Sequence, residues 1–528
     1  MSTILSLRRY KMPPIELCQP TRWELYWHRH GKSTAIVAVL LAVTVVVATI
    51  NIAGFPMRFK DEGVYLSQAW AIQSLGQLAN YTYWYDHPPV GWFQLSLWTI
   101  MTDGFGRYAN NPLVAGREFM VVVRMAIVVL MFILARRIGM RRLWAGFAIA
   151  LFALSPLSVQ FGRYVLLDSI ALPWIIAGFV LAYSPKRRMT AAIGSAVCFT
   201  VGVLTKETMI VVAPALIWAL WSNYRGSSNR KYVMWSWPVV TLMLIGFYPM
   251  YAFIKSEFFA GAGHVSLLQA IEWQLVNRAG SGSVFNSGSD AHHTMNVWLN
   301  SDYLLPLIGA VTSVVALGSK RLRPIAVATL IQLLLLLRTG YLPFMYIIGL
   351  LPFMALVAGG VGDWLWPRFK VWQQQHGWRL YAQSAFAAIT AVAVVLFIAK
   401  AANPWRYTLE YQFTVDADQP ERQAVNWVTA NVPRDAKVVV EGESWLDYVS
   451  RGYSRSSVIW VYKIDTDPEV QKALGIWKNI DYLVLSGVTL VSQDKTTFPQ
   501  VFQAVDNAQE IKTFGTGEDR IVVMKVRK

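Results

Sequence analysis

One apolar run and the charged residues that follow it decide the fold. Residues 34–54 read TAIVAVLLAVTVVVATINIAG, and residues 55–63 continue as FPMRFKDEG. An apolar run of about 20 residues is long enough to cross the hydrocarbon core of a bilayer as a helix. The acidic pair Asp61-Glu62 therefore follows directly on a predicted membrane span.

The same apolar pattern recurs along the chain. Of its 528 residues, 55% are hydrophobic and only 15% are charged, against about 25% in a typical soluble domain. The fold class is thus a polytopic α-helical membrane protein with about 11 transmembrane helices. We place them near residues 34–54, 118–136, 143–161, 169–184, 190–205, 208–222, 233–254, 303–318, 324–338, 342–362 and 381–400.

The positive charges indicate which loops face the cytoplasm. The formal net charge is +17, and the Lys and Arg residues gather in short clusters in every second loop. Such clusters mark cytoplasmic loops, so we predict no nucleic-acid partner. The prediction is a multi-pass protein of the inner (plasma) membrane, with a cytoplasmic N-terminal segment (1–33) and a transmembrane catalytic domain (34–400). Its large outer loops span 55–117 and 255–302, and an extracytoplasmic domain spans 401–528.

The C-terminal residues have a different pattern. Predicted strands at 437–441, 457–462, 482–486 and 520–526 alternate with predicted helices at 419–431 and near residues 446, 470 and 501. Alternating strands and helices are typical of a small α/β domain with a largely parallel sheet. No glycine-rich phosphate-binding motif is present in it, so we interpret it as a docking or lid domain without chemistry of its own.

Ionisable and aromatic residues gather at the outer ends of the predicted spans. A carboxylate can take a proton from an attacking hydroxyl, and Arg or Lys can hold a phosphate and neutralise the charge of the leaving group. Together they suit transfer of a sugar from a lipid-linked phosphate at the outer membrane boundary. The candidates are Asp61, Glu62, Asp86, His87, Arg163, Tyr164, Asp168, Lys206, Glu207, Arg338 and Tyr341.

Several of these residues also have a structural interpretation. Asp168 is a suitable N-cap for the next helix, and Arg163, Lys206 and Arg338 are suited to reach lipid headgroups from span ends. A separate group, Asp290, His292 and His293, has the ligand types of a metal site but no further ligand at a recognisable spacing. We predict no cofactor with certainty and keep a divalent metal ion as an open candidate.

The motifs together resemble a known family. Phe59-Lys60-Asp61-Glu62-Gly63, Asp86-His87-Pro88-Pro89, Gly162-Arg163-Tyr164 leading to Asp168, and Leu204-Thr205-Lys206-Glu207 follow one another in this order. Over residues 34–400 the chain is similar to GT-C glycosyltransferases of family 39 type. This group includes protein O-mannosyltransferases and the aminoarabinose transferases that modify lipid A. Residues 401–528 do not resemble the β-trefoil of the eukaryotic mannosyltransferases, which favours a bacterial member.

The resemblance implies a function and roles for residues. It implies an inverting transfer of a single sugar, hexosyl or pentosyl, from a polyprenyl-phosphate donor to a hydroxyl acceptor in the cell envelope, whether lipid, glycan or protein. Asp61 matches the catalytic acidic residue of the first outer loop, and Asp168 that of the second. Lys206 and Arg338 match cationic positions near the donor phosphate. Two roles stay open for Glu62, which either orients Asp61 or raises the pKa of Asp61 by like charge.

Two other classes of function compete with the transferase. A secondary transporter or lipid flippase binds its substrate near the bilayer midplane, often between internal repeats. The sequence has no such repeat, and its ionisable residues gather at one face. A scaffold that recruits partners through residues 401–528 is the third hypothesis.

Overall fold

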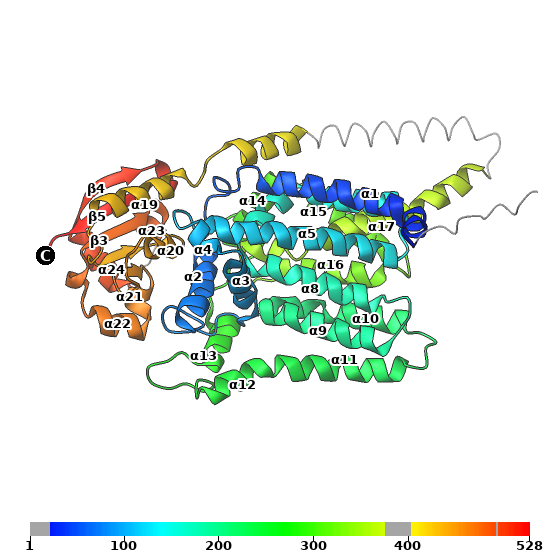
Figure 1. The fold of residues 1–528 in the computed structure, drawn as a ribbon, viewed down its shortest axis with the longest axis horizontal. Helices are drawn as coiled ribbons and strands as arrows, with labels where there is room; N and C mark the ends of the chain where they lie inside the picture. Colours follow the sequence, from blue (N-terminus) through cyan, green and yellow to red (C-terminus); the bar gives the residue numbers. More distant parts are fainter. Residues whose placement is uncertain (1–21, 375–402, 493–494) are drawn as a thin grey trace, which may run out of the picture.

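The computed structural model describes residues 22–374, 403–492 and 495–528. Long helices lie side by side in a bundle, and an α/β segment lies beyond one end of this bundle (Figure 1). The bundle consists of α1 (Arg22–Thr49), α5 (Leu113–Arg137), α6 (Arg142–Leu154), α7 (Pro156–Arg163), α8 (Leu167–Ala182), α9 (Met189–Thr205), α10 (Ala213–Asn223), α11 (Arg230–Ile245), α12 (Phe247–Ile254), α14 (Asp290–Ser301), α15 (Leu304–Ala316), α16 (Arg323–Leu336) and α17 (Leu351–Gln374).

Several of these helices have the length and apolar composition of membrane spans. Within the described residues, four are long enough to cross a bilayer, in the ranges His30–Thr49, Leu113–Arg137, Arg230–Ile254 and Phe344–Arg368, and two bent pairs bring the number to six. Four shorter apolar helices accompany them. The count of eleven spans stays a prediction, and the predicted span 381–400 lies outside the described residues.

One of the bent pairs is α6 and α7, which meet at an angle of 63°. Pro156 begins α7, and the Ser155 hydroxyl caps it by accepting a hydrogen bond from the Ser158 amide at 3.2 Å. The break leaves main-chain carbonyls without helical partners. The buried Arg124 of α5 donates to two carbonyls in the last turn of α6, Ala153 at 3.0 Å and Phe152 at 3.5 Å, and also to the Ser158 carbonyl of α7. Arg124 therefore stabilises the bend.

Two helices of residues 55–117, the predicted first outer loop, run crosswise to the bundle at the end nearest the α/β segment (Figure 1). They are α2 (Lys60–Leu75) and α3 (Val90–Met101), and the short α4 (Gly104–Arg107) follows them. The Glu62 carboxylate accepts a hydrogen bond from the Phe59 amide at 2.9 Å and so satisfies a free donor at the start of α2. Gly76, with φ of 65°, ends the helix in a left-handed conformation that glycine adopts easily.

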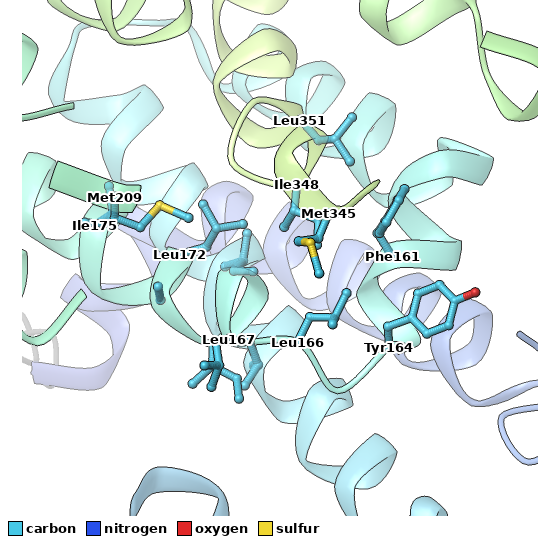
Figure 2. Packing of buried hydrophobic residues seen from close by; sticks show 14 of the residues in the cluster. Phe161, Tyr164, Leu166, Leu167, Leu172, Ile175, Met209, Met345, Ile348 and Leu351 are labelled. Carbon is cyan, nitrogen blue, oxygen red and sulfur yellow. The ribbon is translucent and has the colours of Figure 1, made fainter. Parts of the chain in front are cut away.

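The apolar core extends from the bundle into the outer helices. Figure 2 shows the part where α7 and α8 pack against the segment before α17, with Phe161, Leu172, Met345 and Ile348 in one buried cluster. Tyr65 of α2 and Trp92 of α3 belong to the same buried cluster. The ends of α8 and α9 are therefore held in fixed positions beneath α2 and α3.

The α/β segment contains a five-stranded mixed sheet with strand order β2-β1-β3-β5-β4. The strands β1 (Val438–Val440), β2 (Val458–Trp460) and β3 (Tyr482–Ser486) are parallel, whereas β5 (Ile521–Val526) pairs antiparallel with both β3 and β4 (Ala508–Phe514). The prediction of a largely parallel sheet is therefore correct for only half of the pairings. Helices α19 (Gln419–Asn431), α20 (Trp445–Ser450), α21 (Lys463–Thr466), α22 (Pro468–Leu474), α23 (Gly487–Ser492) and α24 (Pro499–Asp506) surround it.

The α/β segment is tied to the first outer loop by buried polar contacts. Arg58 donates to Asp418 at 2.8 Å and to Asp447 at 2.7 Å, and all three side chains are buried. The Tyr81 hydroxyl donates to the Val458 carbonyl at 2.7 Å. Val64 of α2 belongs to the same buried apolar cluster as residues of the α/β segment. Apolar packing therefore also holds the segment against α2.

Candidate active site

The buried ammonium of Lys206 lies at the centre of a polar cluster. It lies 3.2 Å from His87 Nε2 and 3.7 Å from Asp168 Oδ2. The other ring nitrogen of His87, Nδ1, lies 3.0 Å from Glu207 Oε2. An ammonium can only donate, so when the His87 ring is neutral its Nε2 accepts from Lys206 and its Nδ1 donates to Glu207. The structure thus brings together four residues that the sequence singled out.

These four residues meet because each stands at the end of an element. Asp168 is in the first turn of α8, and Lys206 directly follows α9. His87 precedes Pro88-Pro89, which leads into α3. Adjacent helices α8 and α9 are antiparallel and joined by a short loop, so the start of one and the end of the other lie at the same face of the bundle.

Asp61, in the first turn of α2, faces this cluster. Burial raises the pKa of its carboxyl group, and the nearby charges of Lys206, His87 and Lys60 partly offset that rise. Within the described residues, no side chain donates a hydrogen bond to this carboxylate. Asp86 adds a further negative charge nearby. Asp61 is therefore a carboxylate with raised proton affinity whose oxygens are open to a ligand.

Two further pKa values follow from the same network. Burial acts to lower the pKa of His87, but the Glu207 carboxylate outweighs this effect and raises it. Burial also acts to lower the pKa of Lys206, and the carboxylates of Asp168, Glu207 and Asp61 together raise it. Lys206 is consequently a permanent positive charge among acidic groups.

The Glu62 carboxylate is held by protein hydrogen-bond donors, unlike that of its neighbour Asp61. It is fully buried, and each of its oxygens accepts two hydrogen bonds. Oε1 accepts from Arg117 Nε at 3.2 Å and from the Val165 amide at 3.0 Å, and Oε2 accepts from Arg117 Nη2 at 3.1 Å and from the Phe59 amide at 2.9 Å. These contacts fix the start of α2 against the α7–α8 turn. They leave no oxygen for a substrate, so the catalytic role predicted for Glu62 is not supported.

Arg163 and Tyr164 are also placed away from the Lys206 cluster. The buried Arg163 guanidinium donates to the main-chain carbonyls of Val47 at 2.9 Å and Gln412 at 3.1 Å. The Tyr164 ring packs edge-on against Phe59 with ring centroids 5.8 Å apart, and Figure 2 shows it at the border of the apolar core. Both residues thus have structural contacts in the fold, and their binding of the donor stays a prediction.

Two cations surround Tyr341 at the rim of the site. Arg338 is exposed and donates to the Tyr341 carbonyl at 2.9 Å. The Arg278 guanidinium stacks on the Tyr341 ring, 3.5 Å from its centroid. Tyr346 interacts electrostatically with both Arg338 and Lys206, which links this rim to the cluster. Arg278 was not among the residues predicted from the sequence, since nothing in the sequence of residues 255–302 indicates that it meets Tyr341.

The candidate metal ligands Asp290, His292 and His293 do not form a metal site in the part of the chain that the structure describes. Asp290 and His293 lie in the first turns of α14, and the ring of His292 donates from Nδ1 to the Val284 carbonyl at 2.8 Å. Within residues 22–374, 403–492 and 495–528, no three His, Cys, Asp or Glu side chains are grouped so as to hold a metal ion. The structure therefore gives these three residues no support as metal ligands.

Comparisons with known proteins bear on the family and the fold of the chain. Residues 89–265 match the family model described as dolichyl-phosphate-mannose-protein mannosyltransferase. No curated protein sequence matches the chain. The structure resembles ArnT from Cupriavidus metallidurans bound to undecaprenyl phosphate, with a TM-score of 0.54 and 15% identity over 94% of this chain and 98% of that one.

A second solved structure shares the fold. The oligosaccharyltransferase of Archaeoglobus fulgidus in the apo form matches with a TM-score of 0.53 and 11% identity, over 94% of this chain and 76% of that one. Both proteins are GT-C glycosyltransferases. The chain therefore has the fold of the GT-C glycosyltransferases, and the resemblance inferred from its motifs is confirmed at that level.

Proposed function

We propose that the chain is a membrane glycosyltransferase that moves one sugar from a polyprenyl-phosphate donor to a hydroxyl acceptor at the outer face of the membrane. The observation that carries the proposal is the Lys206 ammonium, which lies 3.7 Å from Asp168 and in the electrostatic field of Asp61. A cation held between carboxylates beside an open carboxylate suits transfer of a group that leaves as an anion. The ArnT structure, described as bound to undecaprenyl phosphate, supports the donor class.

In this proposal Asp61 is the general base. The acceptor hydroxyl gives its proton to the Asp61 carboxylate while its oxygen forms a bond to the anomeric carbon of the sugar. The bond between that carbon and the phosphate oxygen breaks, and its electron pair leaves with the polyprenyl phosphate. A raised pKa makes Asp61 a stronger base than an ordinary aspartate. Attack opposite the leaving phosphate inverts the anomeric configuration.

In the proposed reaction, the cations bind the phosphate of the leaving group and balance its charge. The positive charge of Lys206 offsets part of the rise that burial causes in the pKa values of Asp61 and Asp168. Arg338 and Arg278, on either side of Tyr341, hold the donor phosphate at the rim. A guanidinium suits this role because its planar donors match two phosphate oxygens at once. Asp168, through its ion pair, orients Lys206 toward the phosphate.

The test uses the purified full chain with a panel of polyprenyl-phosphate sugars and of lipid, glycan and peptide acceptors. We expect release of polyprenyl phosphate with at least one donor, and inversion at the anomeric carbon by NMR of the product. Absence of turnover with every donor and acceptor, together with movement of a labelled lipid across proteoliposomes, would contradict the proposal and support a flippase.

A further inference from the structure

An acidic pocket of about 260 Å³ lies where the first outer loop meets the α/β segment. Residues 57–60 form one wall, so the pocket ends next to Asp61 in the chain. Glu421, Glu441 and Glu443 are part of the opposite wall, and Ser486 and Val488 add a hydroxyl and an apolar surface. The pocket thus lies next to Asp61, the candidate base. Most of its lining comes from the α/β segment, for which the sequence predicted no chemistry.

The charges of the lining do not balance. Five carboxylates line the pocket, from Glu421, Glu441, Glu443, Glu518 and Asp519, against the cations Arg58 and Lys60. Arg58 is already paired with Asp418 and Asp447, neither of which lines the pocket. Lys60 lies over the Tyr462 ring, 4.5 Å from its centroid. A surplus of negative charge therefore faces the pocket.

Two carboxylates in this lining have an oxygen without a partner. Glu421 is 94% buried, being only 6% exposed, and within the described residues its Oε1 has no hydrogen-bond donor. The same holds for Glu443 Oε2. Buried carboxylate oxygens without donors are costly and rare in folded proteins. Burial accordingly raises the pKa of Glu421 to about 7, and burial with the charge of Glu441 raises the pKa of Glu443 to about 8.

An organic cation suits this lining better than a metal ion does. A metal ion needs several ligands within about 2.6 Å of one point, and no three acidic or histidine side chains of the described residues are grouped in that way. An ammonium carries three donors and a guanidinium five, so each can reach carboxylates that are further apart. The Val488 side chain offers contact for an aliphatic stem.

The pocket is held close to the candidate active site by a tight contact. A side chain at Gly63 of α2 would come within 2.2 Å of Glu443 Cα, so the backbone of the α/β segment lies directly on the helix that bears Asp61. Tyr462 lies in the electrostatic fields of both Asp61 and Glu443. A molecule with its cation in the pocket would therefore extend past Lys60 toward Asp61.

We propose that this acidic pocket is an acceptor subsite that binds an ammonium or guanidinium group carried by the molecule whose hydroxyl is glycosylated. The proposal rests on the transferase function proposed above and adds a chemical requirement for the acceptor. The cation supplies the missing donors to Glu421 and Glu443, and the bound acceptor then presents its hydroxyl to Asp61.

Binding is tested without turnover, using putrescine as the probe. The full chain in detergent is titrated with putrescine at about pH 8, at constant ionic strength, and the unfolding temperature is followed. We expect stabilisation of the wild type and at least a tenfold weaker apparent affinity for Glu421→Gln combined with Glu443→Gln. Glutamine has the shape of a protonated glutamate, so this variant is expected to fold. Glu510→Gln, on the exposed strand β4, is the control and should respond like the wild type.

The acceptor role is tested by comparing an amino alcohol with the alcohol that lacks the amine. We expect at least a tenfold lower KM for the amino alcohol in the wild type, and loss of this preference in the double variant with little change in kcat. Equal putrescine affinity in wild type and variant, or an unchanged preference in the variant, overturns the subsite. Putrescine binding that depends on Glu421 and Glu443 in a protein without transferase activity overturns only the proposed function.

Discussion

Replacing Glu62 by glutamine separates a structural from a catalytic carboxylate. The carboxylate is fully buried and lies 3.1 Å from the Arg117 guanidinium. At that distance two unit charges interact by about 5 kcal/mol at an effective dielectric constant of about 20. Both Glu62 oxygens accept from two donors, so the amide NH₂ of glutamine must face two N–H groups. Removal of one partner of a buried ion pair typically costs about 3–5 kcal/mol, and we expect a loss of this size.

The measurement is the apparent unfolding temperature of the detergent-solubilised chain, followed by size-exclusion chromatography of heated samples. The matched control is Glu118→Gln, because Glu118 pairs with Arg107 at 2.8 Å on the surface, where a pair contributes only about 0–1 kcal/mol. We expect Glu62→Gln to lower the unfolding temperature by several degrees more than the control, with near wild-type turnover per folded molecule. A variant as stable as the wild type but without turnover would refute the structural assignment and restore a catalytic one.

Three further predictions concern other charged residues of the chain. Arg124→Met should destabilise the chain by about 1–3 kcal/mol for each carbonyl left without a donor at the α6–α7 bend, measured by the same heating assay and compared with the exposed Arg323→Met. Because the folded-state pKa values of Glu421 and Glu443 are raised to about 7 and about 8, above the ordinary value of about 4.3, the folded protein binds more protons than the unfolded chain. The stability that these two carboxyl groups contribute should therefore be fully present below about pH 4 and be lost as the pH rises through about 7 to 8. Gln at both positions should flatten the resulting decline in unfolding temperature with pH. An equally steep decline in that variant contradicts the assignment of the raised pKa values to Glu421 and Glu443. Arg338→Ala and Arg278→Ala should each raise the KM for the donor about tenfold or more with a smaller effect on kcat, and an unchanged KM in both would exclude them as the phosphate clamp.

Local sequence was sufficient to locate the residues that stand at the ends of helices. Asp168 and Lys206 stand at the ends of α8 and α9, and His87 stands before α3. Their convergence at one face follows from the alternation of membrane-spanning helices, which apolar length and loop charge reveal. The acidic pair at the start of α2 could likewise be placed at that face.

Roles that depend on distant partners could not be predicted from local sequence. Glu62 looks equivalent to Asp61 until Arg117, 55 residues further along, is brought to it by folding. Arg163 satisfies the carbonyl of Gln412, 249 residues away, and no periodicity indicates such a contact. Strand β4 was missed because its residues are mostly exposed, so it lacks the apolar alternation that identifies a strand.

The central claim is that Asp61 is the base that activates the acceptor hydroxyl. It is tested most directly by the single-turnover rate of polyprenyl phosphate release in Asp61→Asn, with donor and acceptor saturating. Asp103→Asn is the control, since Asp103 is exposed and its φ of 48° suits asparagine. We predict a folded Asp61→Asn protein whose rate falls by about 10²–10⁴, while the control keeps the wild-type rate. An Asp61→Asn rate close to that of the wild type would contradict the account.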